Sequence, residues 1–307
     1  GTGSLLAATS DLFVGDDGTG ELEITAGGRV TNFVGVVGRS VGSSGTATIR
    51  GSGSEWLNLD SLGIGIDGSG ALNIEAGGLV TSAESAVGFL ADGRGDVLVD
   101  GAGSLWAAGN TLTLGDFGEG SLFITGGGRV TNVDGFLGDE ITGFGTAFVQ
   151  GAGSTWTNSG ALTIGGAGQA LVSVINGGVL SATGITLAQL AGSEGVLFVG
   201  PNGAAGIIDT PIITGGLGSA FVVFDHTSPA YQFDPLLAGN LRVGHTDVGT
   251  TIFPHANTYT GGTFIAAGRL ITQDVAALGT GTVELDGGAL APSGTLGVDS
   301  LIWTSGN

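Results

Sequence analysis

The chain has 307 residues, of which 65 are glycine, and 27 acidic against 7 basic residues give a net charge of −20. This charge repels phosphate backbones and argues against nucleic-acid binding, and the lack of cysteine excludes disulfides and thiolate metal sites. Charged residues make up only 11%, which excludes a highly charged disordered chain. No apolar run reaches the roughly 18 residues of a membrane-spanning helix.

The first residues contain neither methionine nor a basic segment followed by an apolar stretch. Gly1 is therefore expected to begin a mature or excised piece of a longer protein. A cysteine-free, lysine-free acidic chain also fits an exported protein that crosses membranes unfolded, so we expect an extracellular, cell-surface or secreted location.

A repeat of fifty residues runs through residues 1–200 without slippage. Its marker strings GTGSLL, GSGSEW, GAGSLW and GAGSTW begin at Gly1, Gly51, Gly101 and Gly151. Each block also divides in two, because Gly20 and Ile24 recur half a repeat later as Gly45 and Ile49. Residues 1–200 are thus predicted to form four repeats of two stacked units each.

Short alternating segments within each unit predict strands at 12–14, 22–24 and 29–31, and the glycine-rich pieces between them predict turns. Three short strands in each half-repeat, without a helical period, predict an all-β fold, a right-handed single-stranded parallel β-helix (β-solenoid). The chain length gives about 12 coils, stacked into a rod of roughly 58 Å. Leu12 and Val14 are expected to face inward and Phe13 outward.

A column of tryptophans recurs with the repeat. Trp56, Trp106 and Trp156 alternate with Val30, Val80 and Val130. Because other copies place valine or leucine at the matching positions, we interpret the column as a core ladder. The alternative is a sugar-binding stripe on the surface.

Acidic residues gather in the turns. One set is Asp16, Asp17, Asp67 and Asp116, and a second is Asp134, Asp139 and Glu140. Aspartate favours such turn conformations, so we expect structural turns and assign no catalytic, cofactor or metal residue. Two alternatives stay open: a pair of carboxyls for polysaccharide cleavage, and Ca²⁺ held by the turn carboxylates.

One tripeptide, Arg94-Gly95-Asp96, spells the integrin-recognition motif. Gly95 also belongs to a glycine column of the repeat, which is sufficient to explain its presence. The tripeptide is kept as a candidate adhesive site.

The repeat weakens in residues 201–256, where we expect an irregular continuation of the solenoid with loop excursions. This region holds His226, His245 and His255, with Asp225 and Asp247 nearby. The histidine spacing fits no zinc signature, so surface-loop histidines are expected. Function in a regular scaffold is expected where the regularity fails, which points to these loops.

A different glycine-rich repeat occupies residues 257–307. It reads NTYTGGTFIAAGRL and then ALGTGTVELDGGAL. The last residues, LIWTSGN, stop in mid-motif, so this repeat is expected to be truncated.

Both repeats resemble known bacterial modules. The unit LTLGDFGEGSLFITGGGRVTN, followed by GTAFVQGAGSTWTN, is similar to the repeat shared by autotransporter passengers and sorting-tail-bearing surface proteins. The segment beginning at Asn257 resembles the autotransporter-associated β-strand repeat. The resemblance implies a β-helical passenger exported by type V secretion, with a C-terminal translocator β-barrel as its partner. It implies no catalytic residue.

Three functions are consistent with these observations. The first is a non-enzymatic surface stalk or adhesin that meets a receptor or glycan on a host or neighbouring cell. The second is a fibre subunit that assembles end to end through its open strand edges. The third is a polysaccharide-active enzyme.

Overall fold

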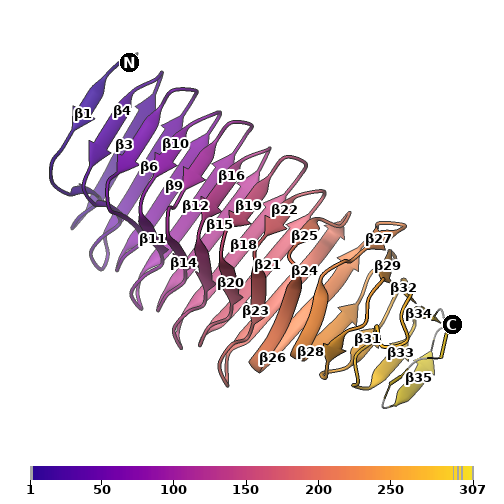
Figure 1. The fold of residues 1–307 in the computed structure, drawn as a ribbon. Coiled ribbons are helices and arrows are strands. Elements are labelled where there is room, and N and C mark those ends of the chain that lie inside the picture. The colour runs from indigo at the N-terminus through magenta and orange to yellow at the C-terminus, as the bar shows by residue number, and fades with distance from the viewer. Residues whose placement is uncertain (1–2, 293, 296, 299, 306–307) are drawn as a thin grey trace.

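The chain winds into an elongated parallel β-solenoid with its two termini at opposite ends (Figure 1). The computed structural model describes all residues except 1–2, 293, 296, 299 and 306–307. No helix occurs among the described residues, and about 10 turns follow one another at a spacing of ~25 residues. The all-β, parallel β-solenoid prediction is confirmed, and the expected number of about 12 such coils is slightly too high.

Each of the N-terminal turns contributes three strands, which stack into three columns. The first column is a nine-stranded sheet. Its strands are β1 (Leu5–Ala7), β4 (Arg29–Asn32), β7 (Glu55–Asn58), β10 (Leu79–Thr81), β13 (Leu105–Ala107), β16 (Arg129–Asn132), β19 (Thr155–Asn158), β22 (Val179–Ser181) and β25 (Ile207–Asp209).

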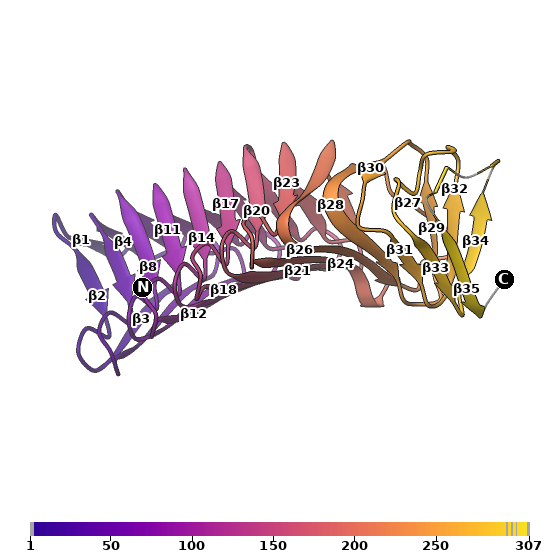
Figure 2. The same ribbon diagram turned by 90° about the horizontal axis from the view of Figure 1, so that it is seen from below.

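The second and third columns lie on adjacent sides of the rod (Figure 2). The second column is formed by β2 (Leu12–Val14), β5 (Gly35–Val37), β8 (Ser61–Ile64), β11 (Glu84–Val87), β14 (Thr111–Leu114), β17 (Asp134–Leu137), β20 (Ala161–Ile164) and β23 (Gly184–Leu187). The third column has longer strands: β3 (Thr19–Thr25), β6 (Ser44–Arg50), β9 (Ser69–Glu75), β12 (Arg94–Asp100), β15 (Glu119–Thr125), β18 (Phe144–Gln150), β21 (Gln169–Ile175) and β24 (Glu194–Gly203).

Alternation along the strands separates core from surface. In β2, Val14 is buried and Leu12 packs against the core, whereas Phe13 is exposed, as the sequence predicts. Because parallel strands pair in register, each inward residue lies on its counterpart in the next coil. A continuous core of stacked ladders results.

The fifty-residue repeat reflects two coils of unequal length. In the first column, Val30 pairs with Trp56 across a longer coil, and Trp56 pairs with Val80 across a shorter one. The third column keeps a constant step of half a repeat, as in the pairing of Gly20 with Gly45. Because long and short coils alternate, valine and tryptophan alternate along one ladder of the core, from each coil to the next.

Most turns between the second and third columns hold a glycine with positive φ, and Ala188 adopts the same conformation with φ +50° after β23. Gly65 has φ +66°, and a Cβ atom there would collide with the carbonyl oxygen of Arg94 in the next coil. Gly115 has the same conformation and meets the carbonyl of Phe144. At these two positions the next coil stacks so closely that a side chain has no space.

The coils shorten near the C-terminus. The strands β26 (Ile212–His226) and β28 (Leu236–His245) run through both the second and third columns and join them into one 22-stranded sheet. Beyond them the sequence step between paired residues is smaller than in the N-terminal coils, as in the pairing of Tyr231 with Thr251.

The shorter coils complete the solenoid. A four-stranded sheet contains β27 (Tyr231–Gln232), β29 (Thr250–Phe253), β32 (Arg269–Thr272) and β34 (Ala289–Pro292). The large sheet ends with β30 (Thr258–Tyr259), β31 (Thr263–Ile265), β33 (Val283–Asp286) and β35 (Leu301–Ser305).

Candidate functional site

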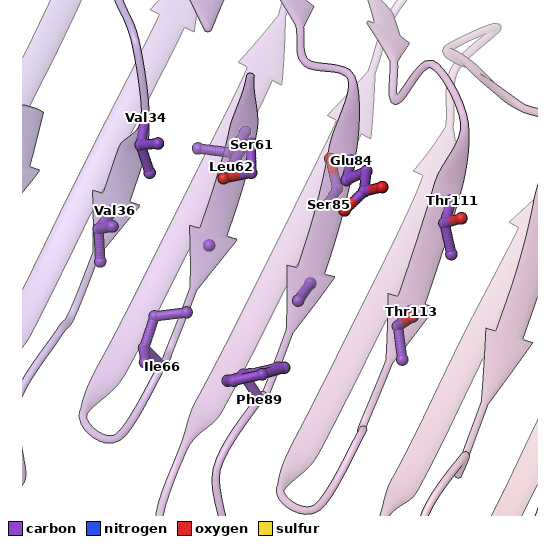
Figure 3. Close-up of a pocket in the computed structure, with 12 residues that line it drawn as sticks. Val34, Val36, Ser61, Leu62, Ile66, Glu84, Ser85, Phe89, Thr111 and Thr113 are labelled. Carbon is purple, nitrogen blue, oxygen red and sulfur yellow. The ribbon is translucent and has the colours of Figure 1, made fainter. Parts of the chain in front are cut away.

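A shallow hollow of about 340 Å³ lies on the outer face of the second column, across β5, β8, β11 and β14 (Figure 3). Val36, Gly63, Ala86 and Thr113 follow one another at its outward positions. Gly63 and Ala86 carry little or no side chain, so the surface is hollowed between their larger neighbours.

Apolar and polar groups line opposite ends of this hollow. Ile66 and the exposed ring of Phe89 lie at one end, and Ser61, Glu84 and Thr111 lie at the other (Figure 3). Its lining contains one carboxyl group, whereas glycoside cleavage requires two that flank the bond. The hollow therefore lacks the pair of carboxyl groups that such cleavage requires.

The acidic turns lie along the corner between the second and third columns. Asp16 forms an ion pair of 3.0 Å with Arg39 in the next coil, and the carboxylate of Asp17 accepts a hydrogen bond from the Ser40 hydroxyl. These two carboxylates thus join neighbouring turns.

Three further acids on this corner repel one another. The backbone N–H of Glu140 donates to the carbonyl of Asp116, which brings the two turns together. Burial raises the pKa of Asp116, and the charges of Asp139 and Glu140 add to that effect. Burial and Glu140 likewise raise the pKa of Asp139. Among the described residues, no group of three or more histidine, cysteine or acidic side chains is arranged to hold a metal ion.

The second acidic set is divided by the fold. Asp134 begins β17, and its carboxylate accepts a hydrogen bond of 2.8 Å from the backbone N–H of Ala161. Asp139 and Glu140 lie beyond the end of the same strand. Asp67, a member of the first set, lies in a separate turn after β8.

The Arg94-Gly95-Asp96 tripeptide lies at the start of β12, a strand paired on both sides. Arg94 and Asp96 are exposed, and Gly95 is buried between Gly70 and Gly120. The Arg94 guanidinium forms an ion pair of 3.1 Å with Glu119. The tripeptide is therefore presented on a strand inside the sheet, and its arginine is paired with Glu119 of the neighbouring coil.

The three repeat tryptophans lie in the first column with no exposed surface. Trp56 packs between Val30 and Val80, and its Nε1 donates to Oδ1 of Asn32 at 2.6 Å. The indole of Trp156 donates to Asn132 in the same way. The alternative of a sugar-binding stripe is wrong, because full burial leaves no indole face for a sugar.

The expectation of surface-loop histidines is wrong for two of the three. His226 and His245 are fully buried, whereas His255 is exposed. The signal was the strand alternation: Val222, Phe224 and His226 face inward in turn, and Val243 precedes His245 in the same way.

Sequence reasoning also missed an outer aromatic column on the third column of strands. The column consists of Leu98, Phe123, Phe148, Phe198 and Val223, with Ser173 between the last two phenylalanines. Phe123 and Phe148 stack with ring centroids 5.1 Å apart. The sequence feature that predicts this column is a large apolar residue at the same outward position of successive coils.

The fold and surface define a parallel β-solenoid with a shallow, weakly charged outer hollow. No family model matches the sequence, and no solved structure matches the chain. In the part of the chain that the structure describes, no helix has the length and apolar character needed to cross a bilayer.

One curated protein shares sequence with part of this chain. A 73-residue stretch, 23% of the chain, is 36% identical to the Adhesin BmaC autotransporter of Brucella suis biovar 1 (strain 1330). The stretch covers 2% of that protein's length. Part of the chain is thus similar to an autotransporter adhesin, while the two repeat types named from the sequence stay predictions.

Proposed function

We propose that this chain is a non-enzymatic segment of an autotransporter passenger, displayed at the cell surface or secreted, where it serves as a stalk and adhesin scaffold. The observation that carries the proposal is the unbroken core ladder of the first column. It runs from Val30 through the tryptophans to Ile208, and each residue stacks on its counterparts in the neighbouring coils. Such a rod becomes longer with each added coil.

The partial similarity to an autotransporter adhesin supports the same proposal. So does the surface chemistry, because the lining of the outer hollow combines Phe89, hydroxyl groups and one carboxylate. We propose this hollow as the contact for a receptor or glycan on another cell. The proposal includes a C-terminal translocator β-barrel as the partner that exports the passenger.

Replacement of the segment in the full-length gene tests the stalk function. Bacteria that lack residues 1–307 are expected to adhere several-fold less than the parent strain. A length-matched solenoid, with the inward residues kept and the outward residues of the second column changed to serine and threonine, is expected to restore surface exposure. The proposal is wrong if deletion changes neither adhesion nor the exposure of the passenger to antibody.

Filling the hollow tests the adhesive contact. Ala86 faces outward, so Ala86→Phe is expected to occupy the hollow while changing the stability by no more than about 0.5 kcal/mol. The matched control is Ala161→Phe, exposed at the start of β20 in the same column and outside the hollow. Adhesion reduced by the first variant and unchanged by the second is the expected result. Equal adhesion of both would remove the hollow from the proposal.

A further inference from the structure

Two histidines lie in the core at the point where the coils shorten. His226 ends β26 and His245 ends β28, and their ring centroids are 5.7 Å apart. An aromatic cluster encloses them. Its members are Phe224, Tyr231, Phe233 and Phe253.

Each ring makes one hydrogen bond and leaves one nitrogen without a partner among the described residues. His226 Nε2 lies 2.9 Å from Thr251 Oγ1, and its Nδ1 has no partner. His245 Nδ1 lies 3.0 Å from the carbonyl oxygen of Ala267, so this nitrogen carries the hydrogen, and Nε2 has no partner. A second proton on either ring would enter an apolar site that offers it no acceptor.

Two carboxylates are the charged groups that act on the pair. Asp225 lies on β26 and accepts a hydrogen bond from Thr246, and Asp247 follows β28 and accepts one from Val248. Both are engaged at the surface. Tyr231 on β27 is the cluster's titratable phenol, and burial raises its pKa, so it stays neutral. The residues packed from β29 and β32, such as Thr251, Phe253 and Leu270, carry no charge.

Burial outweighs these carboxylates. Burial and, to a smaller extent, the neighbouring His245 lower the pKa of His226 to about 4, against the opposing effects of Asp247 and Asp225. Burial also lowers the pKa of His245, against the Ala267 carbonyl and the same two aspartates. In the folded protein both rings are therefore neutral at neutral pH.

We propose that the His226–His245 pair is an acid-sensitive junction, at which mild acid opens the short C-terminal coils while the long N-terminal coils stay folded. The geometry carries this inference: two imidazoles share one apolar chamber, and the strands that hold them join the coil types. All three histidines of the chain lie beyond residue 225, so the N-terminal coils contain no such group.

The sign follows from linkage. A histidine whose pKa is lower in the folded than in the unfolded state binds its proton more readily when unfolded. Stability from this source is complete above the unfolded value near 6.5 and declines as the pH falls toward about 4. With two rings involved, the equilibrium constant for local opening is expected to rise up to about 100-fold per pH unit in this window.

Hydrogen exchange measured by mass spectrometry on the whole chain tests the junction. Protection factors, corrected for intrinsic rates, are compared between pH 7 and pH 5, above the sequence pI of about 4.1. We expect peptides from β28 to β34 to lose at least about 10-fold more protection than peptides from β4 to β22. An equal loss in both regions would overturn the proposal.

Variants separate the histidines from other acid effects. His226→Phe with His245→Phe is expected to abolish the extra loss at the C-terminal coils. If that double variant does not fold, the double variant His226→Gln with His245→Gln replaces it, because glutamine is polar but uncharged at every pH. The same result is expected. The exposed control His255→Gln should behave like the parent protein. A double variant that keeps the full pH response contradicts the proposal.

Discussion

Single side chains in the core depend on partners one coil away. In the first repeat, Asn32 accepts from Trp56 and donates to Asn58 at 2.8 Å. The third repeat has the same arrangement around Trp156. A Cβ on Gly35 would collide with the Asn58 amide, so this network requires glycine at that position.

The second repeat exchanges this network for smaller residues. Ser82 and Ala108 replace the two asparagines, and Ser85 stands where the first and third repeats have Gly35 and Gly135. The hydroxyls of Ser82 and Ser85 lie 2.6 Å apart. As a consequence, Nε1 of Trp106 is buried without a hydrogen-bond partner among the described residues.

Transplanting the asparagine network should stabilise the second repeat. The triple variant Ser82→Asn, Ser85→Gly and Ala108→Asn gives the Trp106 indole an acceptor, so its free energy of unfolding should rise by about 1–3 kcal/mol. Ala108→Asn alone should destabilise, because Ser85 occupies the space of the amide. Urea unfolding of the three proteins checks both signs. A triple variant less stable than the parent would show that the network is not transferable.

The sequence predicted the burial of residues inside the fifty-residue repeat better than the burial of residues outside it. Leu12, Phe13 and Val14 were placed correctly because alternation and repetition agree. His226 and His245 were misplaced because their region lacks the fifty-residue repeat, and histidine by itself favours neither the core nor the surface. Alternation with Val222, Phe224 and Val243 indicates that they face inward once these long strands are placed in register with the earlier coils.

At the scale of elements, the regular half-repeat step in the sequence concealed two different coil lengths. The third column keeps that step, and its glycines set the predicted period. The first column alternates because the segments on either side of each tryptophan differ in length. The coils become shorter where β28 has fewer residues than β26 at the corner between the second and third columns. No local sequence pattern near Gly215 or Ala220 predicts this change.

The corner glycines offer a matched test of coil stacking. Gly65 and Gly51 both have positive φ, but a Cβ on Gly65 meets the Arg94 carbonyl, whereas one on Gly51 has no atom within 4 Å. Gly51→Ala should cost about 1–2 kcal/mol from conformation alone, and Gly65→Ala should cost on the order of 3–4 kcal/mol. Thermal and chemical unfolding measure both. Equal costs would mean that the stacking contact adds nothing.

Across the whole molecule, stability and shape both come from stacking. A chain with a net charge of −20 still forms one continuous core, because its acids lie on the turns and outer faces. Several ion pairs connect neighbouring coils, including Arg29 with Glu55 and Arg50 with Glu75. As exposed pairs they contribute little each, so the buried ladders carry the fold.

The measurement that tests the stacked rod most directly is a set of spin–spin distances along one column. The chain lacks cysteine, so introduced cysteines are labelled without background. Thr46 is separated from Thr146 by four successive pairings and from Val196 by six. At about 4.8 Å per coil, labels should lie about 19 Å and about 29 Å apart. Distances that fail to grow with the number of coils would contradict the account.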